Sequence, residues 1–290
     1  MNIRNKKAFT IVEMLIAIGL LVAMMAASVV VFRVAINAQQ KASATGDYMR
    51  SIRSTSLQIQ NDFSAIDLNA PFAIWFERNG SDRMYFFANG KFEQLSSGNL
   101  DPAQTVYNYG SLFYRTDGST QLLRQFTPAD RYQDIITPSV TASDERDLLK
   151  GLLDAVLLYD ENNAATYGLL LNDQAAKFKV QILYGSEFGS VRWYPEDNPY
   201  PAASVAGDSD YDLMGDSFGV FFNIAAASQG LFYTPQDMDI RLIDGTGNLN
   251  APVNFPVGYK PAALKFTITL DDPDGRLEAK TFTYIVRLIL

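Results

Sequence analysis

The sequence predicts an α+β protein with one long N-terminal helix packed on a mainly antiparallel β head domain. An apolar run covers residues 11–32 and has the length of a membrane-spanning helix. In residues 37–70, apolar side chains then recur at steps of three and four, as on one face of a helix. After Pro71 the chain is aromatic, β-branched and rich in turn residues, which is typical of short antiparallel strands.

Composition limits the function classes that fit this chain. Its 290 residues suffice for one large or two small domains, and its net charge of −8 argues against nucleic acid as a partner. The absence of cysteine excludes disulfides and thiolate sites. The absence of histidine removes the usual general base and the commonest metal ligand. We therefore expect that the protein is not an enzyme and that it holds no resident cofactor.

The apolar run predicts a single membrane-spanning helix over residues 9–36. Arg4, Lys6 and Lys7 precede it, whereas the acidic residues are concentrated downstream. This is the positive-inside arrangement, which places the N-terminus in the cytoplasm and exports the rest of the chain.

Glu13 is the one charged residue between positions 11 and 32. An acidic side chain deep in lipid costs roughly 2.5–3.5 kcal/mol on insertion scales, and it marks a functional site by default. The sequence therefore singles out Glu13 as a candidate functional residue.

The stretch Ala8-Phe9-Thr10-Ile11-Val12-Glu13-Met14-Leu15 resembles the prepilin-type cleavage and methylation signal of type IV pilins and type II secretion pseudopilins. The resemblance implies a leader of residues 1–8, cut by a prepilin peptidase between Ala8 and Phe9, and N-methylation of Phe9. It also implies that Glu13 meets the Phe9 ammonium of a neighbouring subunit. The family usually has glycine where Ala8 stands, and major pilins commonly carry a proline midway along the apolar segment.

The charge pairing has a physical basis of its own. At about 4 Å and an effective dielectric constant of about 20, a carboxylate and an ammonium attract by roughly 4 kcal/mol. This attraction exceeds the insertion cost of Glu13. Because both charges are compensated only when subunits are in register, the pair would set the axial stagger of an assembly.

Other interpretations of the N-terminal run stay open. An ordinary secretory signal, cut near Ala26-Ala27, has a basic start and an apolar core. A plain membrane anchor or a buried helix of a soluble protein also fits the composition. None of these alternatives gives a reason for Glu13.

Residues 37–70 are predicted to continue the helix as an amphipathic segment that packs on the head. Pro71 ends it, since the residue before a proline is biased away from helix. A simple coiled coil is the alternative. The predicted apolar face consists of Ala38, Ala42, Thr45, Met49, Ile52, Ser56, Ile59, Phe63 and Ile66.

Residues 71–290 are predicted to form the exported β-rich head, with a long loop at 195–217 and a further loop at 244–258. Turn signals stand at Asn79-Gly80, Asn89-Gly90, Asp117-Gly118 and Asp274-Gly275. A helix or helix-like turn is expected at 144–159. The predicted strands are 72–76, 83–88, 91–95, 106–109, 112–115, 121–126, 178–184, 191–194, 218–224, 240–243, 264–270 and 280–288.

Parts of the head resemble the J-type minor pseudopilin and the related W-type minor pilin. This resemblance implies a large head whose two sheets pack around the helix. The segments that carry it are Leu112-Phe113-Tyr114-Arg115, Leu123-Arg124, residues 178–184 followed by Trp193, residues 261–268, and the closing residues 282–288.

Acidic clusters were considered as sites of chemistry. Asp208, Asp210 and Asp212 are weak candidates for calcium ligands, and residues 271–275 fit a hairpin turn better than a metal site. The carboxylates of Asp144, Glu145 and Asp147 fit a solvated helix start better than a catalytic pair. Packing is a better explanation than a binding patch for the aromatic residues Trp193, Tyr194, Tyr200 and Tyr211.

The sequence thus predicts a minor pilin or pseudopilin, a structural subunit of a type IV pilus or type II secretion filament at its tip or in initiation. Its expected partners are a prepilin peptidase, other subunits and the bacterial inner membrane, with the head periplasmic or extracellular. A pilin-anchored adhesin that binds through residues 195–258, and a plain membrane-anchored exported domain, are the alternatives.

Overall fold

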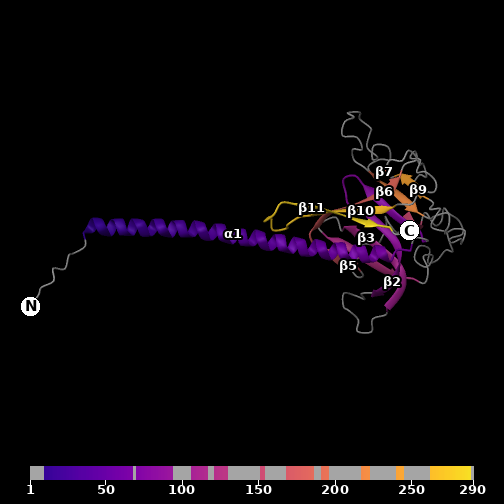
Figure 1. The fold of residues 1–290 in the computed structure, drawn as a ribbon, viewed down its shortest axis with the longest axis horizontal. Helices are drawn as coiled ribbons and strands as arrows, with labels where there is room; N and C mark the ends of the chain where they lie inside the picture. The colour runs from indigo at the N-terminus through magenta and orange to yellow at the C-terminus, as the bar shows by residue number, and fades with distance from the viewer. Residues whose placement is uncertain are drawn as a thin grey trace, which may run out of the picture. The chain divides into compact units, whose positions relative to one another are not determined.

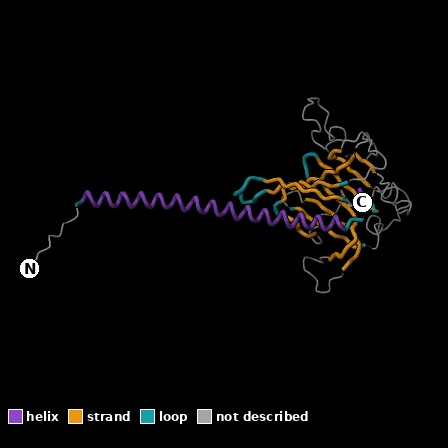
Figure 2. The backbone as a smooth tube through the Cα atoms, viewed as in Figure 1, coloured by secondary structure: helices purple, strands orange, loops and turns teal. Residues whose placement is uncertain are grey.

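The computed structural model describes residues 10–67, 70–93, 106–116, 121–129, 151–153, 168–185, 191–195, 217–222, 240–244 and 262–288. Its backbone contacts divide the chain into two compact units, Met1–Met49 and Arg50–Leu290. A long N-terminal helix and antiparallel β-sheets make up the described part, which confirms the α+β class and gives a pilin-like architecture (Figures 1 and 2).

The helix α1 runs from Ile11 to Ser64. The sequence predicted a helical segment that continues to residue 70, and the observed end is earlier because the chain leaves the helix to pair with a strand. The N–H of Asn89 donates to the carbonyl of Ala65 (2.7 Å), and the N–H of Asp67 donates to the carbonyl of Phe87 (2.8 Å). Backbone groups just past the helix thus find their partners in the sheet.

A seven-stranded antiparallel sheet forms one layer of the second unit. Its spatial order is β5-β4-β3-β2-β1-β8-β9, so the N-terminal strand β1 lies inside the sheet. The strands are β1 (Phe72–Glu77), β2 (Arg83–Glu93), β3 (Val106–Thr116), β4 (Leu122–Pro128), β5 (Gly168–Asn172), β8 (Ser217–Phe222) and β9 (Ile240–Asp244).

A four-stranded antiparallel sheet has the order β11-β10-β6-β7. Its strands are β6 (Ala175–Gly185), β7 (Val191–Tyr194), β10 (Ala263–Leu270) and β11 (Lys280–Arg287). The expected pairing of β6 with β7 and the closing hairpin of β10 and β11 are both confirmed.

Two strand predictions were wrong in the same way. Asn89-Gly90 makes no hairpin turn, because β2 continues through it with a register shift between Asn89 and Phe92. The N–H of Asn89 is already bonded to Ala65, which keeps the chain extended there. Similarly, β3 runs unbroken through Gly110, where a side chain would collide with Phe126 and the carbonyl of Thr127. The strand β5 was not predicted.

The final turn of α1 packs against both sheets. The ring of Phe63 stacks on Phe86 of β2, with ring centroids 4.7 Å apart, and lies 5.1 Å from Phe266 of β10. Phe178 of β6 continues this aromatic cluster between Tyr114 of β3 and Phe266. Burial of such large rings is the main apolar stabilisation of the unit.

The predicted apolar face of the helix is only partly correct. Ile59 and Phe63 are buried as expected, but Met49 is 53% exposed and Ala38 and Ala42 are also exposed. Two polar side chains, Thr55 and Asp62, are buried on the segment within the second unit. They tolerate burial because each has a hydrogen-bond partner in the sheets.

Candidate functional site

The first turn of α1 holds Glu13 in a reciprocal cap. Thr10 N–H and Thr10 Oγ1 both donate to Glu13 Oε2, at 3.0 and 3.1 Å, and Glu13 N–H donates to Thr10 Oγ1 at 3.3 Å. Met14 N–H donates to the carbonyl of Thr10 at 3.2 Å, closing the first helical turn. This is a capping box, which satisfies N–H groups that have no partner within the helix.

Thr10 was not singled out from the sequence, although its spacing from Glu13 is the Thr-x-x-Glu signature of a capping box. The cap gives Glu13 a role within one chain. It does not exclude a second role, because the carboxylate is exposed and its remaining lone pairs can accept from a cation.

The helix segment that follows Glu13 exposes large apolar side chains on all its faces. The bulky apolar residues between Ile11 and Ile36 are 51–81% exposed. A window of this helix has a mean hydropathy of 2.8, and α1 is the one helix in the described ranges that is long and apolar enough to cross a membrane. A helix that is apolar all round needs lipid or other helices about it.

Several predicted site residues lie outside the described ranges. Ala8 and Phe9 are among them, so the cleavage site and the pairing of Glu13 with a Phe9 ammonium stay predictions. The other residues outside these ranges are Asp208, Asp210, Asp212, Asp144, Glu145, Asp147, Tyr200 and Tyr211, together with the predicted helix 144–159 except for helical residues 151–153.

The acidic run at residues 271–275 is a hairpin turn, as expected. The carboxylate of Asp272 accepts from the N–H groups of Arg276 and Leu277 (2.8 and 3.1 Å) and from Arg276 Nη2 (2.9 Å). The hydrogen bond from the Arg276 side chain, helped by the N–H groups of Asp274 and Arg276, holds the pKa of Asp272 down to about 2. In the described part of the chain, no three acidic side chains gather as a metal site would require.

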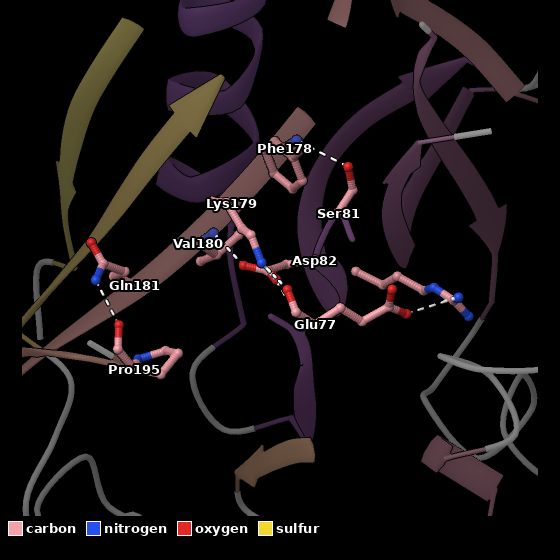
Figure 3. A network of polar contacts seen from close by, with 9 residues as sticks. Glu77, Ser81, Asp82, Phe178, Lys179, Val180, Gln181 and Pro195 are labelled. Carbon is pink, nitrogen blue, oxygen red and sulfur yellow. Dashed lines mark hydrogen bonds and ion pairs between the residues drawn. The ribbon is translucent and has the colours of Figure 1, made fainter. Parts of the chain in front are cut away.

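The turn between β1 and β2 joins the two sheets through Asp82 (Figure 3). Its carboxylate accepts from the N–H of Val180 on β6 (2.7 Å), from Lys179 Nζ (3.0 Å) and from the N–H of Glu77 (3.0 Å). Phe178 N–H also donates to Ser81 Oγ at 3.1 Å. Burial raises the pKa of Asp82 to about 6, against the opposing effects of Lys179 and the two N–H groups.

A second buried carboxylate, Asp62, fastens the helix to the seven-stranded sheet. Asp62 accepts from Arg124 Nη2 (2.8 Å) and Nε, from Gln58 Nε2 (3.0 Å) and from the hydroxyl of Tyr114. The pairing of Asp62 with Arg124 was not predicted from the sequence. A signal was present, because Asp62 follows Ile59 by three residues and precedes Ile66 by four, which places it on the apolar face.

Two of the aromatic residues that were considered for a binding patch, Trp193 and Tyr194, lie within the described ranges. Tyr194 is fully buried against Phe76 and Phe218, so packing is confirmed for it. Trp193 lies under the ammonium of Lys265, whose nitrogen is 4.7 Å from the ring centroid. Neither arrangement forms a ligand site.

Comparisons of the chain with protein-family models, with curated proteins and with solved structures found no match. The geometry of α1 and of the head therefore carries the functional argument.

Proposed function

We propose that the chain is a minor pilin or pseudopilin, a structural subunit that joins a helical filament or its tip complex through the first part of α1. The observation that carries this proposal is Glu13, the one charged residue of the helical segment 11–32, which is otherwise apolar on all its faces. The second support is the head, which consists of two antiparallel sheets with an aromatic core. A large head with two sheets was expected from the resemblance to minor pseudopilins.

In this proposal α1 anchors the subunit in the inner membrane, with the N-terminus cytoplasmic and the head outside. After a prepilin peptidase removes residues 1–8, the Phe9 amine of one subunit meets Glu13 of the next. Contacts of this kind join different patches head to tail, so they propagate into a filament instead of closing.

The capping box makes a sharp test possible, because it separates the two roles of Glu13. Glu13→Gln keeps a side-chain oxygen for the N–H of Thr10 and so keeps the cap, but it removes the charge. We expect this variant to insert and to be processed normally, yet to enter filaments about tenfold less or worse. Immunoblotting of sheared filaments and of the membrane fraction measures both quantities.

Glu13→Asp is the matched control, since it keeps the charge on a shorter side chain and should retain more assembly than Glu13→Gln. N-terminal mass spectrometry should find a mature chain that starts at methylated Phe9. A different mature start, or normal filaments from Glu13→Gln, contradicts the proposal.

A second candidate function is a plain membrane-anchored exported domain. The capping box favours it, because the box explains Glu13 without a partner subunit. Under this alternative Glu13→Gln behaves as wild type in every assay, and Phe9 is not methylated.

A further inference from the structure

The strand β11 forms one edge of the four-stranded sheet. It pairs with β10 over its whole length, from Lys280 opposite Leu270 to Arg287 opposite Ala263, without a register shift. In the described part of the chain no strand pairs with its other side. Figure 1 shows β11 in yellow beside β10. An unpaired strand edge is a template on which another strand can add.

The hydrogen-bond alternation identifies the backbone groups on this open side. Leu288 N–H donates to the carbonyl of Ala262 at 3.1 Å, so the even-numbered residues of β11 direct their N–H and C=O groups toward β10. The odd-numbered residues direct theirs outward, and within the described ranges these groups have no backbone partner. These residues are Thr281, Thr283, Ile285 and Arg287.

Between its two terminal residues, β11 lacks the features that usually block strand addition. Its sequence from Thr281 to Val286 consists of β-branched and aromatic residues, with neither proline nor bulge. Ile285 is 51% exposed on this strand. The other described edge strands, β5, β7 and β9, have five, four and five residues against eight in β11.

Charge indicates what kind of strand fits. Lys280 and Arg287 stand at the two ends of β11, and neither forms an ion pair within the described residues. Exposed Glu278 lies on the preceding turn, outside the strand. Because only odd-numbered residues have outward groups, the fullest antiparallel pairing of two copies of β11 would set Arg287 opposite Thr281 and would place no carboxylate opposite Lys280 or Arg287. A partner strand that carries carboxylates therefore matches this edge better than a second copy of β11 does.

We propose that the open edge of β11 is a docking site that adds one extended strand of a partner protein with acidic residues at both ends of the segment. The outward groups of Thr281, Thr283, Ile285 and Arg287 supply the main-chain hydrogen bonds, and Lys280 and Arg287 select the partner by charge. This inference goes beyond the proposed function and does not require processing at Phe9.

The test uses the full chain in detergent micelles and two capped peptides of the same length as β11. Both peptides consist of alternating threonine and valine; one carries glutamate at both ends and the other carries lysine at both ends. We expect the glutamate peptide to bind at least tenfold tighter by fluorescence polarisation. Thr283→Pro removes an outward N–H and should weaken its binding at least tenfold. Proline is tolerated on an edge strand whose N–H faces solvent, so the fold should persist.

Thr283→Val is the matched control, because it changes the side chain and keeps the N–H, and it should bind as wild type. The double variant Lys280→Glu with Arg287→Glu should reverse the preference toward the lysine peptide, which keeps the test decisive should the proline variant misfold. Binding of neither peptide, equal binding of both, or an unchanged preference in the double variant overturns the proposal. Glu13→Gln should leave peptide binding unchanged, which separates this test from that of filament assembly.

Discussion

Two carboxylates in the head have pKa values shifted in opposite directions by their surroundings. The pKa of Asp82 rises from 3.8 to about 6 because burial disfavours its charged form more than Lys179 and two backbone N–H groups favour it. The pKa of Asp272 falls from 3.8 to about 2, chiefly because Arg276 donates to its charged form. Within the described residues the Asp272 carboxylate accepts five hydrogen bonds, two of them from the Arg276 guanidinium, whereas that of Asp82 accepts three.

These shifts predict two separate pH windows of stability. Asp82 binds its proton more tightly in the folded state, so its contribution is present below about pH 4 and is lost as the pH rises through 6. The size of this loss is about 3 kcal/mol in the free energy of unfolding. The contribution of Asp272 is present above about pH 4 and is lost as the pH falls toward 2.

The variant Asp82→Asn tests the upper window. We expect its free energy of unfolding to vary less between pH 4 and 6 than that of wild type, measured by urea denaturation with tryptophan fluorescence. The difference between the wild-type and variant curves of unfolding free energy against pH removes the contributions of all other titrating groups. Parallel curves over this range would show that Asp82 titrates alike in the folded and unfolded chain.

At the scale of the elements, the end of α1 is held on the sheet by a buried charge pair. Asp62 and Arg124 have side chains only 3% and 10% exposed, and both oxygens of Asp62 accept hydrogen bonds. Burial and the nearby charge of Asp62 raise the pKa of Tyr114 well above its usual value, so its hydroxyl stays a donor. The helix thus has one favoured position on β3 and β4.

Removing one partner of this pair should be costly. We expect Asp62→Ala to lower the free energy of unfolding by about 3–5 kcal/mol, because it leaves Arg124 buried without its counter-charge. The neighbouring, exposed Asn61→Ala serves as control and should change stability by less than about 0.5 kcal/mol. Adding Arg124→Met to Asp62→Ala should recover part of the loss. If Asp62→Ala lowered the free energy of unfolding no more than Asn61→Ala does, the stabilising role of Asp62 would be contradicted.

At the scale of the molecule, the sheets predict a gradient of local stability within the second unit. The strand β1 is buried and pairs with β2 on one side and β8 on the other, whereas β11 is paired on one side only. Amides at a free edge exchange without global unfolding, and those of a central strand need a larger opening.

Hydrogen exchange should display this gradient. We expect the amides of β1 to exchange on the order of 100-fold or more slowly than those of Thr281, Thr283 and Ile285. Mass spectrometry with fragment resolution measures both sets in one sample, and the even-numbered β11 amides, bonded to β10, are the internal control. Equal protection of odd and even residues would contradict the deduced alternation.

Features that depend on neighbours along the chain could be predicted from the residues alone. The apolar run, the strands 72–76, 191–194 and 264–270, and the turn at Asp274-Gly275 follow from hydrophobic period and turn chemistry, which are local properties. The sequence also singled out Glu13, because a charge within an apolar run is visible without coordinates.

Features that depend on partners distant in sequence emerged only in the folded chain. Asn89-Gly90 stayed extended because Ala65 takes its N–H, and Asp62 became a buried anchor because Arg124 and Tyr114 converge on it. The open edge of β11 likewise follows from sheet order. Burial and hydrogen-bond satisfaction are set by the whole contact network, so no local pattern specifies them.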